Sequence, residues 1–123
     1  MFVVWINSSS APFMDNIGAL LKRYETRSKK MLHFLIGQRV ILAESKNGKR
    51  LARYSVVIRS VTEVRSQEQW DAMRPLHRVP VGNKYDWKPD TKVKYLYELS
   101  DLRRLRPFTV PEGVPRGRTG TEI

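Results

Sequence analysis

The sequence contains no cysteine and only two histidines among its 123 residues. Without cysteine there is no disulfide framework and no thiolate chemistry, which suits the reducing cytoplasm where we expect the protein to work. His33 and His77 lie far apart in the chain, and Asp86 and Asp90 alone are too few to complete a ligand set. Because metal sites need several such side chains at paired spacings, we expect no metal and no cofactor.

Long apolar runs are also missing. No stretch approaches the roughly 20 apolar residues that a membrane-spanning helix needs. The apolar start, residues 2–6, has no Lys or Arg before it and is interrupted at once by residues 7–10, Asn-Ser-Ser-Ser. We therefore expect a first strand instead of a signal peptide, and no membrane partner. The Gly-rich phosphate loops of Walker or Rossmann type are absent as well.

Acidic residues are few, with 12 Asp and Glu against 23 Lys and Arg, and the net charge is +11. The positive charge follows residue 21, because residues 1–21 contain Asp15 and no Lys or Arg. This asymmetry favours a polyanionic partner such as RNA, although a basic soluble surface is the alternative interpretation. We expect phosphate contacts from four basic side chains, Arg53, Lys84, Lys88 and Lys94.

The hydrophobic pattern predicts one domain over residues 1–108 and a basic Gly- and Pro-rich tail over residues 109–123. Apolar residues at helical spacing (Phe13, Ile17, Leu20, Leu21) predict a helix that Ser10 caps and that ends near residue 22. Ser66 should cap a second helix over residues 67–74, and residues 75–91 read as a long functional or mobile loop. Strand patterns cover residues 2–6, 24–26, 38–45, 51–64, 93–99 and 102–108.

The dipeptide Asn47-Gly48 predicts a type I′ hairpin turn between the third and fourth strands, because both turn residues must adopt positive φ. Together the elements follow the order β-α-β-β-β-α-β. This order predicts an α+β fold, a small mixed β-barrel with two or three short flanking helices.

The run Lys22-x-x-Glu25-x-Arg27 is the most informative motif. In a strand, side chains two residues apart point to the same side, so Glu25 and Arg27 should face one way with Lys22 in the turn above them. Such a cluster could hold a planar polar ligand or a phosphate. It could also be a salt-bridged surface strand, and the residues alone leave both interpretations open.

This run, placed after an apolar helix and before Gly37-x-x-Val40, resembles the G-x-K-x-x-E-x-R signature of ASCH domains, which are relatives of the PUA barrels. The closing pattern from Tyr95 to Phe108 resembles the last strand of the same family, so the similarity covers roughly residues 2–108. Two positions depart from it. Leu20 stands where the signature has Gly, and Arg53-Tyr54 stands where many relatives keep a Gly.

The resemblance implies a cleft beside the signature that binds RNA or a modified nucleobase. Some ASCH proteins resemble RNA-cleaving enzymes, and others are amidohydrolases that deacylate modified cytidine with Thr at the position of Glu25. We therefore expect an RNA- or modified-nucleoside-binding domain. The alternatives are a hydrolase that uses Lys22 and Glu25 for proton transfer and a basic accessory protein. The expected ligand-binding residues are Lys22, Glu25, Arg27, Trp5, Asn7, Ser8, Tyr85, Trp87 and Tyr97.

Overall fold

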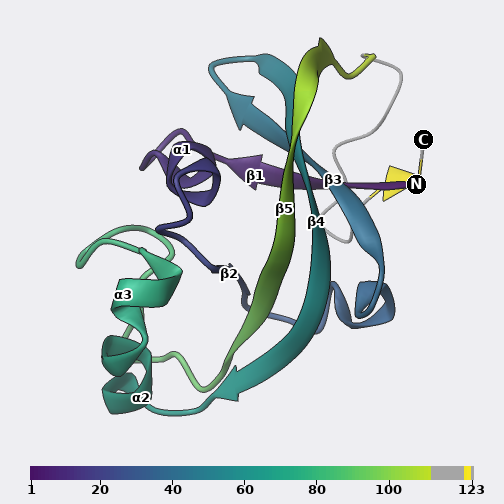
Figure 1. Cartoon of the computed structure of the whole chain (residues 1–123). Coiled ribbons are helices and arrows are strands. Elements are labelled where there is room, and N and C mark those ends of the chain that lie inside the picture. Colours follow the sequence, from purple (N-terminus) through teal and green to yellow (C-terminus); the bar gives the residue numbers. More distant parts are fainter. Residues whose placement is uncertain (112–120, 123) are drawn as a thin grey trace.

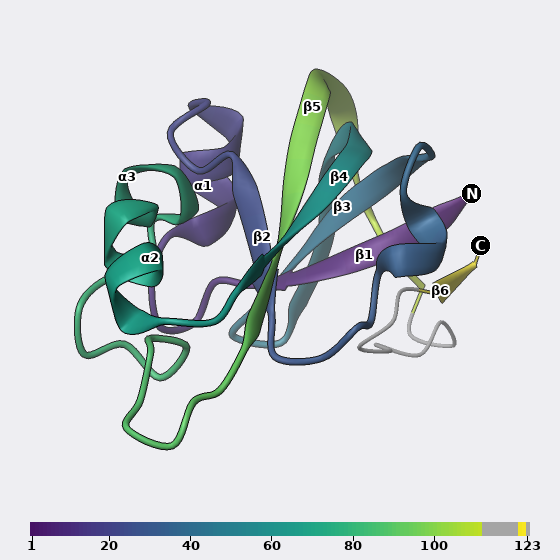
Figure 2. The same cartoon turned by 90° about the horizontal axis from the view of Figure 1, so that it is seen from below.

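The structure, a computed structural model, describes residues 1–111 and 121–122. Its strands are β1 (Phe2–Asn7), β2 (Tyr24–Arg27), β3 (Arg39–Lys46), β4 (Lys49–Val64), β5 (Lys94–Thr109) and β6 (Thr121–Glu122). Its helices are α1 (Phe13–Gly18), α2 (Gln67–Ala72) and α3 (Arg74–His77), with a 3₁₀ turn, η1, at His33–Leu35. The three α-helices gather on one side of the molecule, opposite the N-terminus (Figures 1 and 2). The predicted α+β class is confirmed.

The strands form one mixed sheet in the order β2-β5-β4-β3-β1-β6, in which β1 and β3 are parallel and the other neighbours antiparallel. Among the described strands this row ends at β2 and β6, so the sheet does not close into the full barrel that the sequence suggested. Even so, β2 lies close enough to β1 for one of its side chains to reach the main chain of β1. Arg27 Nη2 donates a hydrogen bond to the Trp5 carbonyl over 3.1 Å.

The long β4–β5 ladder forms the centre of the sheet (Figure 1). Asn47 and Gly48 have φ of 51° and 78°, which confirms the predicted turn between β3 and β4. In β5 the consecutive residues Tyr95, Leu96 and Tyr97 are all buried. Consecutive buried residues mean that both faces of this strand are covered.

Two apolar clusters flank the sheet. The larger one joins the sheet to the helices and includes Val4, Ile6, Phe13, Trp70 and Tyr97. The smaller one contains Val3, Trp5, Ala43, Ala52 and Val110. Successive β1 residues thus pack on opposite faces, as a strand requires. Of the expected tail, residue 110 is buried and β6 pairs with β1, while residues 112–120 and 123 lie outside the described residues.

Helix α1 is shorter than predicted. It begins at Phe13, and the hydroxyl that accepts a hydrogen bond from its first turn is Ser8 Oγ, bonded to Met14 N–H at 3.2 Å, so the prediction of a Ser10 cap is wrong. It ends at Gly18, where a Cβ would lie 2.2 Å from the Tyr54 hydroxyl oxygen. Shortly after this Leu20 adopts φ 61° and turns the chain, which leaves its side chain 57% exposed instead of in the predicted stripe.

This turn aims the next residues at the core. The backbone N–H groups of Leu21 and Lys22 both donate to the Asn16 carbonyl, over 2.9 and 3.0 Å. Leu21 is 45% exposed, contrary to the predicted stripe, whereas Lys22 is only 2% exposed. The chain therefore turns a lysine inward and a leucine outward, a result that helical periodicity could not predict.

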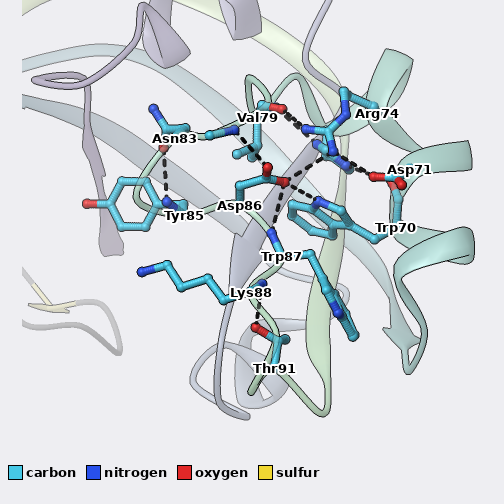
Figure 3. Close-up of polar contacts among 12 residues, drawn as sticks. Trp70, Asp71, Arg74, Val79, Asn83, Tyr85, Asp86, Trp87, Lys88 and Thr91 are labelled. Carbon is cyan, nitrogen blue, oxygen red and sulfur yellow. Dashed lines mark hydrogen bonds and ion pairs between the residues drawn. The ribbon is translucent and has the colours of Figure 1, made fainter.

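The segment between α3 and β5 is an ordered loop built around one carboxylate, Asp86 (Figure 3). Asp86 Oδ1 accepts hydrogen bonds from the Trp70 indole at 2.7 Å, from Trp87 N–H at 2.8 Å and from Arg74 at 3.1 Å. Its Oδ2 accepts from Gly82 N–H at 2.9 Å. These bonds tie the predicted long loop to both α2 and α3.

The conformation of Leu20 leads to a stability prediction. A left-handed non-glycine residue costs about 1–2 kcal/mol, and glycine adds back roughly 0.5–1 kcal/mol of chain entropy. Leu20→Gly should therefore raise the free energy of unfolding by about 0.5–1 kcal/mol. Leu21→Gly, at an exposed neighbour without positive φ, should lower it. Urea titrations of both variants test this, and equal losses in the two would contradict it.

The carboxylate of Asp86 should matter strongly for stability. Asp86→Ala leaves the Trp70 indole and the Arg74 guanidinium without this acceptor, so we expect a loss of about 2–4 kcal/mol in the free energy of unfolding. Burial alone would raise the pKa of Asp86, but the four donors lower it from 3.8 to about 2. The stabilisation is therefore complete above the unfolded pKa and disappears as the pH falls from about 4 to 2.

Urea titrations at several pH values measure this contribution. The exposed Asp90, on the same loop, provides the control variant Asp90→Ala, which should behave like the unaltered protein. If Asp86→Ala lost stability over the same acid range as the unaltered protein, the carboxylate would not be responsible.

Candidate functional site

A cavity of about 650 Å³ opens between β1 and β2, where the sheet is not closed by strand pairing. Its lining comes from β1, α1, the turn after α1, β2, the segment before η1, the end of β3, the loop that precedes β5 and the first residue of β5. The lining residues are Trp5, Ile6, Asn7, Phe13, Lys22, Glu25, Thr26, Arg27, Ser28, Met31, Ser45, Tyr85 and Lys94. The size suits a small organic ligand, since such pockets usually measure about 300–1,000 Å³.

Lys22 provides the buried cation of the cavity. Its Nζ donates a hydrogen bond to the His77 carbonyl at 2.6 Å and lies 5.0 Å from the centre of the Phe13 ring. Burial lowers the pKa of Lys22 from 10.5 to about 8, while the Glu25 carboxylate opposes this shift and the Arg27 charge adds to it. The amine is therefore mostly protonated at neutral pH, but it is easier to deprotonate than an ordinary lysine.

The main-chain carbonyl of His77 binds Lys22, whereas the His77 ring contacts neighbouring parts of the fold. Nδ1 accepts a hydrogen bond from Val79 N–H at 3.0 Å, so the proton sits on Nε2, which donates to the Trp70 carbonyl at 3.0 Å. The ring also stacks on the Trp70 indole with centroids 3.8 Å apart. Burial lowers the pKa of His77 to about 4, so the imidazole stays neutral.

Glu25 is only 6% exposed and has two unlike carboxylate oxygens. Oε1 accepts a hydrogen bond from Thr26 N–H at 2.9 Å and pairs with Arg27 Nη1 at 3.2 Å. Oε2 is buried and has no hydrogen-bond partner among the residues that the structure describes. A buried carboxylate oxygen without a partner is costly for the fold, so this oxygen stands out among the polar atoms of the site.

Arg27 connects the two sides of the opening. Nη1 donates to the Thr26 carbonyl at 3.2 Å besides pairing with Glu25, and Nη2 donates to the Trp5 carbonyl on β1. The guanidinium therefore spans from β2 to β1 and holds the carboxylate in place. The structure brings Lys22, Glu25 and Arg27 together around one hollow.

Four other expected site residues also line the cavity: Trp5, Asn7, Tyr85 and Lys94. Tyr85 lies across from Phe13, with ring centroids 6.1 Å apart. The Trp5 carbonyl contacts Arg27, while its ring packs in the smaller apolar cluster, 5.1 Å from the Arg50 guanidinium.

Three further residues from the expected ligand set lie elsewhere. Ser8 holds the first turn of α1, as described above. Tyr97 is fully buried in the core, where its hydroxyl bonds to His33 Nδ1 at 2.6 Å. Trp87 packs near Trp70, with ring centroids 6.3 Å apart. The two loop aromatics of the expected ligand set are thus divided: Tyr85 lines the cavity, whereas Trp87 packs against Trp70 of α2.

Two of the residues expected to contact phosphate have partners within the protein. Arg53 pairs with Asp15 at 2.8 Å and with Glu44 at 3.5 Å. Lys84 is exposed and its Nζ lies 5.0 Å from the centre of the Tyr85 ring.

Sequence reasoning missed several residues that line the cavity. Phe13 was assigned to a core stripe, although its position at the start of α1 places the ring beside Lys22. Met31 lies in a segment with no clear pattern. Only the three-dimensional path of the chain reveals these contributions, since neither residue stands near the motif in a way that period-two or period-3.6 spacing would indicate.

The chemistry of the site is that of charged hydrogen-bonding groups. Within residues 1–111 and 121–122 no group of three or more His, Asp or Glu side chains is arranged to hold a metal ion. Over the same residues no helix has the length and apolar character needed to cross a membrane.

The fold is similar to that of solved structures that include an ASCH protein and two of its variants. The ASCH protein of Zymomonas mobilis superposes with a TM-score of 0.72 at 15% identity, covering 89% of this chain and 73% of its own. A tyrosine-to-phenylalanine variant of it gives 0.71 at 14% identity, with coverage of 89% and 75%. A serine-to-alanine variant gives 0.71 at 16%, with coverage of 88% and 72%.

No protein-family model and no curated protein sequence matches this chain. At such low identity the structural likeness establishes the fold alone. The prediction from the Lys22–Arg27 signature is confirmed at that level: this chain has a small α+β fold like that of the ASCH structures.

Proposed function

We propose that this protein binds RNA or a modified nucleoside and places one base in the cavity between β1 and β2. The observation that carries the proposal is Glu25 Oε2, a buried acceptor beside the buried cation Lys22. Oε1 is already engaged by Thr26 and Arg27, so Oε2 is the oxygen that would accept a hydrogen bond from a ligand donor.

The edge of a nucleobase offers the complementary groups. An exocyclic amine donates to a carboxylate, and a ring nitrogen or carbonyl beside it accepts from an ammonium group. Glu25 and Lys22 supply these two partners within one hollow. The Phe13 and Tyr85 rings add flat apolar surface, which is the kind of wall on which RNA-binding proteins stack unpaired bases.

The overall charge supports a polyanion. A net charge of +11 attracts nucleic acid at a distance and supplies affinity that does not depend on sequence. In this proposal the cavity reads one base, while basic side chains outside it hold the backbone.

A hydrolase that acts in the same cavity is the second candidate, and the lowered pKa of Lys22 favours it. An amine with a pKa of about 8 is close to the range in which side chains transfer protons efficiently. The substrate would then be single-stranded RNA or an acylated nucleoside, with Lys22 and Glu25 as the proton-transfer pair. The two candidates differ in whether the bound molecule is recovered unchanged.

Glu25→Gln tests both candidates at once. The amide oxygen can still accept from Thr26 N–H. The amide nitrogen then takes the place of Oε2, and as a donor it cannot accept a hydrogen bond from the ligand amine. We expect an affinity loss of roughly tenfold or more, equivalent to about 1.5–3 kcal/mol for a hydrogen bond to a charged group. Calorimetry with nucleosides and short RNAs measures it, with chromatography of the recovered ligand to detect turnover.

Glu63→Gln, at an exposed residue of β4, is the matched control and should bind like the unaltered protein. Equal affinities for Glu25→Gln and the unaltered protein would reject the base-binding proposal. Product formation by the unaltered protein that Glu25→Gln abolishes would favour the hydrolase.

Lys22→Met should separate binding from stability. The folded pKa of about 8 lies below the ordinary 10.5, so between these values the unfolded chain holds a proton that the folded chain has lost. The free energy of unfolding should therefore rise with pH over this range, by about 3 kcal/mol from this group. Lys22→Met removes that rise and should be at least as stable as the unaltered protein at pH 7, yet bind ligand more weakly.

Denaturant titrations between pH 7 and 10.5 check this, with the exposed Lys29→Met as the control that keeps the pH-dependent rise. Ligand affinity should fall as the pH passes about 8 in the unaltered protein, because Lys22 then loses its proton and with it the positive charge that strengthens its hydrogen bond to the ligand. Parallel stability curves for Lys22→Met and the unaltered protein would refute the assignment.

A further inference from the structure

A second, more open hollow of about 300 Å³ adjoins the cavity and shares Ser28 and Lys94 with it. Its other lining residues are Asp90, Thr91, Lys92 and Val93. The walls come from two distant parts of the chain, one directly after β2 and the other directly before β5. A molecule that occupies the cavity can therefore continue into the hollow across the shared residues.

Lys94 marks the junction between the two spaces. Its half-buried side chain donates from Nζ to the Tyr85 carbonyl at 2.6 Å and lies 5.0 Å from the Trp70 ring centre. These contacts fix the position of the ammonium group. Burial lowers the pKa of Lys94, the Asp86 carboxylate opposes the shift, and the nearby charge of Lys88 adds to it. An anion placed here would offset both the burial and the repulsion between the two lysines.

The rim of the hollow is ordered by a short turn. Lys88 N–H donates to Thr91 Oγ1 and Thr91 N–H donates to the Lys88 carbonyl, both over 2.9 Å. Figure 3 shows the Lys88 side chain extending to the same side of the segment as the Tyr85 ring, which lines the cavity. The lysines that line the hollow, Lys92 and Lys94, both lie on the wall directly before and at the start of β5.

We propose that this second hollow holds the phosphate next to the bound base, so that the ligand is a strand of single-stranded RNA and not a free nucleoside. This inference rests on the proposed function, because it takes one base in the cavity as given. A phosphodiester carries one charge and several acceptor oxygens. Lys92 and Lys94 provide donors for it in the hollow, and the Thr91 hydroxyl provides another.

Asp90 also lines the hollow, and its carboxylate repels an anion. It limits the affinity for phosphate alone and favours a ligand whose base is held in the cavity at the same time. Unstacked bases of single-stranded RNA meet this requirement, whereas bases within a duplex cannot enter the cavity. Asp90→Asn should therefore tighten binding of a nucleotide and leave binding of a nucleoside unchanged.

The test compares ligands with and without the phosphate. We would measure the affinity of the protein for the four ribonucleosides, their 3′- and 5′-monophosphates and short single-stranded RNAs, by calorimetry and fluorescence anisotropy. The unaltered protein should bind one monophosphate series and the RNAs at least about tenfold more tightly than the nucleosides. Lys88→Ala combined with Lys92→Ala should remove most of that gain and leave nucleoside binding within about twofold.

Arg104→Ala combined with Arg106→Ala is the control with the same change in net charge. Both side chains are exposed on the outer half of β5, ten or more residues from Lys94 and hence about 30 Å along the strand. This variant should keep the tenfold gain. Equal losses of RNA affinity in the two double variants would overturn the inference, because they would mean that net charge alone is responsible.

Failure of this inference and failure of the proposed function have different signatures. If nucleosides bind in a Glu25-dependent way but the phosphate adds nothing, only the second hollow is refuted. If RNA binding is independent of Glu25, or if no ligand of the three classes binds at low salt, the proposed function is refuted and this inference with it. RNA binding that depends on Glu25 and on the Lys88–Lys92 pair supports both, even where nucleoside binding is too weak to detect.

Discussion

The burial of one ammonium group is the constraint around which this structure is arranged. Lys22 is 2% exposed, and an ammonium group removed from water must be compensated locally. The His77 carbonyl, the Glu25 carboxylate and the Phe13 ring supply that compensation from three different elements. Each of these partners is positioned by its own contacts, so α1, β2 and α3 meet at a single charge. The helices therefore do more than cover the sheet, because they make it possible to keep a cation inside.

The opening beside this charge follows from how the sheet ends. Among the described residues, no further strand pairs with the outer edge of β2. Side chains of β2 itself bond to main-chain groups of the strand instead. Glu25 accepts from Thr26 N–H, and Arg27 donates both to the Thr26 carbonyl and across the gap to Trp5. Satisfying an edge in this way leaves space that a paired strand would have filled. The cavity and the polar groups that line it thus have the same origin.

The parts of this arrangement that depend on short-range patterns were predictable. The Asn47-Gly48 turn, the Ser66 cap and the convergence of Glu25 and Arg27 on one side follow from turn chemistry, capping and period-two spacing. The end of α1 was not predictable in this way, because it depends on the contact between Gly18 and the distant Tyr54. The loop before β5 likewise takes its form from hydrogen bonds of Asp86 to residues on other elements.

Binding and catalysis make opposite demands on Lys22. To hold an acceptor the amine must be protonated, and with a pKa of about 8 it is protonated in roughly nine molecules of ten at pH 7. To act as a base it must be neutral, and its hydrogen bond to the His77 carbonyl favours the protonated form further. An anionic ligand in the neighbouring hollow would raise the pKa of Lys22 and so strengthen the donor while weakening the base. The surroundings of the amine therefore favour the proposed binding role over the hydrolase alternative, and a phosphate in the neighbouring hollow would increase that preference.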